Sequence, residues 1–124
     1  VSGSSLYYDR GIISYTNQAK HELLQVPCDI LDRYGAVSES VAAKMAERVR
    51  LNANADIGVS TTGIAGPTGG SKEKPVGLVY IGLSTVKETL VKRFVFKGNR
   101  LENKDLTVTE ALRLINEVIT QMDL

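Results

Sequence analysis

Two apolar runs on either side of a glycine-rich loop constrain this fold more than any other feature. Residues 56–62 and 76–85 are rich in the Val, Ile, Leu and Thr side chains typical of buried strands. The loop between them, residues 63–70, contains four glycines and one proline. Strands that are apolar on both faces must be covered by helices, so these runs predict a layered α/β domain.

Four helices are predicted around these strands. Asn17 is a candidate cap for a short helix that runs through residue 24, and Pro27 suits the first turn of another that ends at Gly35. Ser38 is a candidate cap for a helix to about residue 51. The last helix shows the clearest helical spacing of apolar residues: Val108, Ala111, Leu112, Ile115, Val118, Ile119 and Met122.

Two further strands complete the predicted sheet. Residues 9–15 are predicted to form a short strand before the first helix. Residues 86–88 turn the run at 76–85 into a second strand at 89–97, as in a hairpin. Helices that alternate with strands, together with one hairpin, predict a mixed sheet.

Composition excludes several classes of protein. The chain has 124 residues, which corresponds to one domain, and its net charge of +1 does not support a basic surface for direct nucleic-acid binding. No segment approaches the ~20 apolar residues of a membrane span, so no membrane partner is expected. Cys28 is the only cysteine and His21 the only histidine, which disfavours disulfides and a zinc site and makes a reducing cytoplasm the expected location.

The glycine-rich loop matches neither standard phosphate-binding motif. A Walker loop requires Gly-Lys-Ser/Thr, whereas this chain reads Gly70-Ser71-Lys72, and a dinucleotide fingerprint requires a helix after its glycines. Glycines nevertheless allow backbone N–H groups to approach an anion or a developing oxyanion. The spacing alone leaves a binding loop and a simple surface turn equally open.

Lys20 and Arg100 are the charged residues that could take part in chemistry. If Asn17 is the cap, Lys20 lies in the first turn of its helix, where the positive end of the dipole lowers a lysine pKa toward that of a general base. Tyr15 precedes that helix and could hydrogen-bond nearby. Arg100 begins the last helix and could bind phosphate. An exposed lysine, a half-buried tyrosine and a surface arginine remain the alternatives.

Several segments together resemble the C-terminal domain of the CinA (competence/damage-inducible) proteins. They are residues 14–20 (Ser-Tyr-Thr-Asn-Gln-Ala-Lys), 35–39 (Gly-Ala-Val-Ser-Glu), 62–67 (Thr-Gly-Ile-Ala-Gly-Pro), 74–77 (Lys-Pro-Val-Gly) and 98–100 (Gly-Asn-Arg). The stand-alone form of that domain is nicotinamide-nucleotide amidohydrolase. The resemblance implies a three-layer α/β/α sandwich with a mixed, mostly parallel sheet.

The resemblance also implies an activity and a site. The activity is hydrolysis of the carboxamide of nicotinamide mononucleotide to nicotinate mononucleotide and ammonia, by a serine nucleophile with a lysine base, with no metal and no cofactor. It implies a homo-oligomer whose partner is a small nucleotide substrate. The family's catalytic lysine and tyrosine correspond to Lys20 and Tyr15. Its substrate-binding residues correspond to Asn17, Thr62, Gly63, Gly66 and Arg100.

The chain departs from the family pattern at its start. The family's serine nucleophile lies in a Glu-Ser-Cys-Thr-Gly-Gly motif upstream of the position of Val1, while Ser4 and Ser5 match a different family position. We therefore expect residues 1–124 to be an N-terminally incomplete domain that lacks one strand and one helix of the family fold. The alternative is a non-catalytic nucleotide-binding or regulatory module of a longer CinA-type protein.

Overall fold

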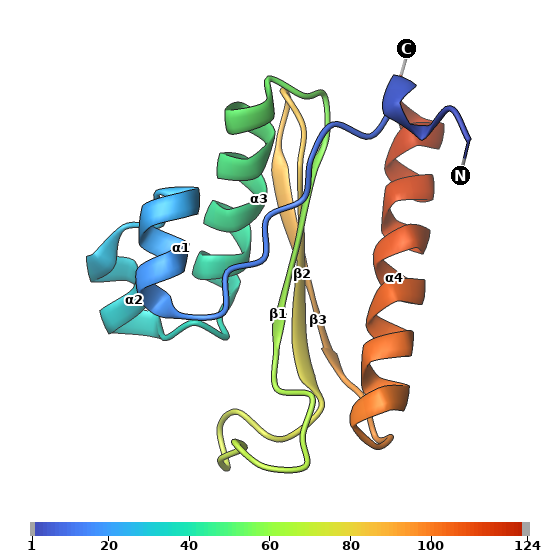
Figure 1. The fold of residues 1–124 in the computed structure, drawn as a ribbon. Coiled ribbons are helices and arrows are strands. Elements are labelled where there is room, and N and C mark those ends of the chain that lie inside the picture. Colours follow the sequence, from blue (N-terminus) through green and yellow to red (C-terminus); the bar gives the residue numbers. More distant parts are fainter. Residues whose placement is uncertain (1, 123–124) are drawn as a thin grey trace.

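The protein folds into a sheet with helices on both faces, as Figure 1 shows. The computed structural model describes residues 2–122. Its strands are β1 (Gly58–Gly63), β2 (Leu78–Ser84) and β3 (Thr89–Val95), arranged in the order β1-β2-β3. Helices α1 (Asn17–Leu24), α2 (Cys28–Tyr34) and α3 (Glu39–Ala53) lie on one side of the sheet, and α4 (Arg100–Gln121) lies on the other. The three-layer α/β/α prediction is confirmed.

The prediction of a mostly parallel sheet is wrong, because both strand pairs are antiparallel, whereas the hairpin predicted between residues 76–85 and 89–97 is confirmed by the pairing of β2 with β3. Gly63 pairs with Val79 and Leu83 pairs with Leu90, and no parallel pair occurs within residues 2–122. Parallel neighbours need a crossover connection of a dozen or more residues, usually a helix. Here the glycine-rich loop and a tight hairpin return the chain directly beside itself. Hydrogen bonds from Ile64 N to Leu78 O and from Gly77 N to Ile64 O continue the antiparallel arrangement into the loop.

The strand predicted at residues 9–15 is also wrong. This segment has no regular secondary structure, and it follows a short 3-10 helix at Ser4–Leu6. In the described part of the chain β1 pairs only with β2, so no strand supplies the ladder of hydrogen bonds that residues 9–15 would need. Ile12 still packs against the core formed by α1, α2 and α3. The adjacent Ile13 is 92% exposed, so only one of these two isoleucines contributes to the packing.

The helices agree with the sequence-based prediction to within about two residues. Ser38 caps α3, and its Oγ accepts a hydrogen bond from Val41 N over 3.3 Å. Gly35 ends α2, and its N–H donates to the Leu31 carbonyl. Asn99 forms a capping box with Glu102 at the start of α4.

The core has two parts, one on each face of the sheet. α3 approaches the sheet closely because small residues face it: Ser60 Oγ donates to Ala42 O over 2.6 Å, and a Cβ on Gly82 would lie 2.6 Å from the same oxygen. Between the helices on that side lie Leu24, Val26, Leu31, Val41 and Met45. Between the sheet and α4 lie Val79, Ile81, Leu83 and Leu114.

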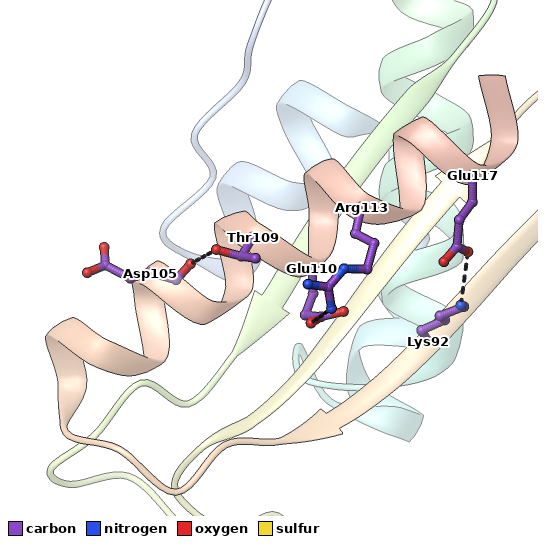
Figure 2. Close-up of polar contacts among 6 residues, drawn as sticks. All are labelled: Lys92, Asp105, Thr109, Glu110, Arg113 and Glu117. Carbon is purple, nitrogen blue, oxygen red and sulfur yellow. Dashed lines mark hydrogen bonds and ion pairs between the residues drawn. The ribbon is translucent and has the colours of Figure 1, made fainter. Parts of the chain in front are cut away.

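The surface of α4 carries ion pairs, and Leu101, Val108, Leu112 and Ile119 of the same helix are also exposed. Figure 2 shows Arg113 paired with Glu110 at 2.6 Å on the helix surface, and Lys92 of β3 paired with Glu117 at 3.4 Å. All of these side chains retain solvent contact, and exposed ion pairs of this kind contribute at most about 1 kcal/mol each. Attachment of α4 therefore depends chiefly on Leu114 and its apolar neighbours.

Candidate functional site

Thr62, Gly63, Gly66 and Arg100 lie toward one end of the sheet, whereas Tyr15, Asn17 and Lys20 lie on α1 and the segment before it. β1 ends at that end of the sheet, and the glycine-rich loop begins there. α3 and α4 both start toward this end, as the lower part of Figure 1 shows. Helix N-termini carry partial positive charge, so this end of the molecule favours an anionic group.

Lys20 is buried on α1, with 6% of its surface exposed. Its Nζ donates a hydrogen bond to the carbonyl of Ser14 over 3.0 Å, and no ion pair involves it within residues 2–122. Burial of the ammonium lowers the pKa of Lys20 below its ordinary value of 10.5. A lysine in this setting can give up its proton and act as a base.

The cap of α1 is Thr16, not Asn17 as predicted. Thr16 has an extended backbone, and its Oγ1 accepts a hydrogen bond from Ala19 N over 3.0 Å. Threonine and asparagine side chains can both accept this bond, and asparagine is the more frequent cap, so the composition of the turn favoured Asn17. Lys20 therefore lies one residue deeper in the helix than predicted. Asn17 becomes the first helical residue, and its side chain is exposed.

Tyr15 follows Ser14 but is not joined to Lys20. It is 93% exposed, and no hydrogen bond within the described residues connects its hydroxyl to the lysine. The two residues are linked only through the backbone, because the Lys20 amine is bonded to the carbonyl of the residue just before Tyr15. The Tyr15 hydroxyl is therefore accessible to a molecule that binds from outside.

Thr62 and Gly63 end β1. The Oγ1 of Thr62 donates to the carbonyl of Ala36 over 2.8 Å, which ties the strand to the turn between α2 and α3. A Cβ at Gly63 would lie 2.8 Å from Leu78 O, so a larger residue would displace the neighbouring strand. Both residues line an apolar hollow of about 470 Å³ between β1 and α4, which Val108 and Leu112 bound on the helix side.

Gly66 and Arg100 are brought together directly. The guanidinium of Arg100 donates from Nη1 to the Gly66 carbonyl over 3.1 Å. Gly66 has a positive φ of 91°, a conformation that favours glycine. Arg100 also borders a second hollow, of about 530 Å³, which lies between Pro67 of the loop and the start of α4. A guanidinium has five N–H donors, so this contact leaves others for a ligand.

Asn103 contacts the same loop and was missed in the sequence. It is 1% exposed, and its Nδ2 donates to the Ala65 carbonyl over 3.1 Å. A signal was available, because residue 103 lies on the same helical face as Ala111 and Leu114. A polar residue in an apolar helical stripe indicates a buried polar contact.

The described part of the chain shows neither a metal site nor a membrane helix. Within residues 2–122, no group of three or more His, Cys, Asp or Glu side chains is placed to hold a metal ion. No helix among these residues has the length and hydropathy required to span a bilayer.

Comparison with known sequences identifies the relatives of this chain. The model of the CinA C-terminal domain matches residues 1–119. A competence-damage inducible protein of Thermoanaerobacter sp. strain X514 is 50% identical over 119 residues, which cover 96% of this chain and 29% of that protein. A CinA-like protein of Syntrophus aciditrophicus strain SB is 47% identical over 120 residues, with coverage of 96% and 29%. The chain thus spans about three-tenths of the length of these relatives.

Solved structures show the same fold. The competence/damage inducible protein CihA from Agrobacterium tumefaciens superposes with a TM-score of 0.91 at 39% identity, over 94% of this chain and 72% of that chain. The competence damage-inducible protein A (ComA) from Klebsiella pneumoniae subsp. pneumoniae MGH 78578 superposes with a TM-score of 0.92 at 30% identity, over 97% and 74%.

Proposed function

The chain belongs to the CinA C-terminal domain family, and on that basis we propose that it carries the substrate site of a nicotinamide-nucleotide amidohydrolase. The reaction is hydrolysis of the carboxamide of nicotinamide mononucleotide to nicotinate mononucleotide and ammonia. The nucleophile is a serine in a segment that precedes residue 1 in the intact protein. By "intact protein" we mean this chain together with that preceding segment.

The observation that carries the proposal is the burial of Lys20. A lysine that is 6% exposed, with a lowered pKa and a carbonyl oxygen as its hydrogen-bond partner, is suited to accept a proton from a serine hydroxyl. An exposed lysine keeps its ordinary pKa, so it gives up its proton less readily than a lysine whose pKa is lowered by burial. The absence of an ion pair to Lys20 within residues 2–122 leaves burial as the dominant influence on its pKa.

The proposed chemistry balances with this lysine alone as the proton carrier. The serine oxygen attacks the carboxamide carbon while its proton moves to Lys20 Nζ. The C–N bond of the resulting tetrahedral intermediate then breaks, and Lys20 returns the proton to the departing ammonia. Water, deprotonated by Lys20, then attacks the acyl-serine ester. The bond between the acyl carbon and the serine oxygen breaks, Lys20 returns its proton to that oxygen, and the product acid loses its proton to solvent as the carboxylate. Tyr15, whose hydroxyl is accessible, completes the catalytic group by orienting the reacting amide.

The other named residues hold the substrate. The backbone at Thr62 and Gly63 stabilises the oxyanion. The backbone at Gly66 binds the substrate. Arg100 binds the phosphate with the N–H groups that the Gly66 carbonyl leaves free. Asn17, exposed at the start of α1, contacts the substrate from the side of Lys20. The same proposal includes a cytoplasmic homo-oligomer that works in pyridine-nucleotide salvage.

Ammonia release from nicotinamide mononucleotide by the intact protein tests this function. We expect the wild-type protein to release ammonia and nicotinate mononucleotide in equal amounts. Lys20→Met should lower kcat by a factor of roughly 10² to 10⁴, the usual contribution of a general base. Lys44→Met is the matched control, because Lys44 lies on α3 in a partly buried pair with Glu47, away from α1, and should leave kcat unchanged.

Three outcomes would overturn the proposal. Absence of ammonia release from folded wild-type protein would exclude the amidohydrolase. Saturable nucleotide binding without turnover would instead indicate a nucleotide-binding module. Full activity of Lys20→Met would remove Lys20 from the mechanism.

A further inference from the structure

Asn103 occupies a position that is costly for an asparagine. It lies in the second turn of α4, where asparagine has poor helix propensity, and 1% of its surface is exposed. Burial of a side-chain amide is unfavourable unless both its oxygen and its nitrogen are hydrogen-bonded. The residue is therefore tolerated only because of the bonds it makes.

Both halves of the Asn103 amide are satisfied by backbone groups. Oδ1 accepts a hydrogen bond from Gly98 N over 3.0 Å, and Nδ2 donates to Ala65 O over 3.1 Å. The partners fix the orientation of the amide, because one is a donor and the other is an acceptor. Asn103 thus joins the start of α4 to the glycine-rich loop.

The bond to Ala65 sets the direction of the next N–H group. The only cis peptide among the described residues is Gly66–Pro67, so the Ala65–Gly66 peptide is trans. In a trans peptide the carbonyl and the following N–H point in opposite directions. When Asn103 holds the Ala65 carbonyl toward α4, the N–H of Gly66 must point away from α4.

The Gly66 N–H is the donor that remains at this point of the loop. No hydrogen bond from it to another group occurs within residues 2–122. The adjacent Gly66–Pro67 peptide has no N–H, because proline lacks one. The Gly66 carbonyl is itself bonded to Arg100, so two successive carbonyls are held by α4 side chains.

We propose that Asn103 is a positioning residue that orients the Ala65–Gly66 peptide, so that the Gly66 N–H is presented to the bound substrate. The identity of the substrate, nicotinamide mononucleotide, rests on the proposed function. The hydrogen bonds that orient the Ala65–Gly66 peptide do not depend on it. Asn103 lines the hollow between β1 and α4, and the role assigned to it is exerted through the loop.

Asn103→Asp in the intact protein perturbs the relevant bond. The aspartate keeps an oxygen that can accept from Gly98 N, while its second carboxylate oxygen, when ionised, repels Ala65 O instead of donating to it. We expect KM for nicotinamide mononucleotide to rise about ten-fold while kcat stays within about two-fold. Asn103→Leu, which loses both bonds, should raise KM at least as much. Asn116→Asp, an exposed asparagine on the same helix, is the matched control and should change neither constant.

A measurement without substrate keeps the inference separate from the activity. The amide resonance of Gly66 in the intact protein should move in Asn103→Asp and stay in place in Asn116→Asp. If the protein does not hydrolyse the nucleotide but this resonance shifts in Asn103→Asp, the proposed reaction is refuted and the positioning role of Asn103 is supported. An unmoved Gly66 resonance, or an unchanged KM in folded Asn103→Asp, would overturn the inference. If both variants fail to fold, hydrogen exchange of the wild-type protein provides the test. Exchange at the Gly66 amide as slow as at the bonded Ile64 amide would overturn the inference. Faster exchange at Gly66 than at Ile64 would support it.

Discussion

The amine of Lys20 donates a hydrogen bond to the carbonyl of Ser14 over 3.0 Å, and the residue is almost fully removed from solvent. One hydrogen bond to a neutral oxygen does not replace the hydration that a charged ammonium loses on burial. The fold therefore carries a cost while Lys20 is protonated, and that cost is the physical origin of its lowered pKa.

This cost predicts a pH dependence of stability. Because the pKa of Lys20 is lower in the folded protein than the value of 10.5 for the unfolded chain, the unfolded chain binds more protons between these two values. The contribution of Lys20 to the free energy of unfolding must then rise with pH in that window, by at most about 1.4 kcal/mol per pH unit. Below the folded pKa both states are protonated and the full cost remains.

Urea unfolding of the wild-type protein and of Lys20→Met at a series of pH values measures this effect. Other groups titrate equally in both proteins, so the difference between the two curves reports Lys20 alone. We expect the stability of the wild type to rise relative to that of the variant as pH increases toward 10.5. Parallel curves would show that the lysine is not desolvated in solution.

The start of α1 predicts a difference between two adjacent residues. Thr16→Ala should lower the free energy of unfolding by about 1 kcal/mol, because it removes the acceptor for Ala19 N. Asn17→Ala should change it by less than about 0.5 kcal/mol, because that side chain is exposed. Thermal or urea unfolding distinguishes the two. A larger loss from Asn17→Ala would make Asn17 the cap, as the sequence suggested.

Addition of one methyl group at Gly77 is expected to lower the free energy of unfolding strongly. Its φ is 93°, and an added Cβ would lie 1.9 Å from the carbonyl oxygen of Phe96, a backbone atom that cannot move alone. Gly69 has a similar φ of 96°, but the nearest atom to an added Cβ is 3.7 Å away. Gly69→Ala should therefore cost only the strain of the left-handed backbone, about 1–2 kcal/mol.

Gly77→Ala should cost at least about 2 kcal/mol more than Gly69→Ala, because overpacking adds to the same strain. Urea unfolding of both variants gives the difference directly. Equal losses would mean that the strand end near Phe96 moves aside without cost.

Substitution of Thr62 is expected to lower the free energy of unfolding, whereas substitution of the neighbouring Thr61 is not. Thr62→Val keeps the shape of the side chain but removes the donor to Ala36 O, which should cost about 1–3 kcal/mol. Thr61→Val alters an exposed position on the same strand and should stay within about 0.5 kcal/mol. Thr62→Ser should recover most of the loss. If Thr62→Val and Thr61→Val unfold at the same urea concentration, the bond to Ala36 contributes nothing to stability.

The sequence alone was sufficient to place the helices and the three paired strands. α3 begins after Ser38, and the apolar spacing from Val108 onward correctly predicted α4. Caps, helical spacing and β-branched runs depend on residues within a few positions of one another, so local sequence carries this information. Lys20 and the glycine-rich loop were named as candidate site features from local sequence as well, because a helix start and a run of glycines are visible within a few positions.

The antiparallel pairing of β1 with β2 and the contacts of the loop came only from the folded chain. An extended segment such as residues 9–15 becomes a strand only if another strand lies beside it, and its own residues do not record that partner. Thr62 meets Ala36 across 26 positions, and Asn103 meets Ala65 across 38. The burial that lowers the pKa of Lys20 likewise arises from packing around α1. Such contacts join residues far apart in the chain, so they exist only once the layers have packed together.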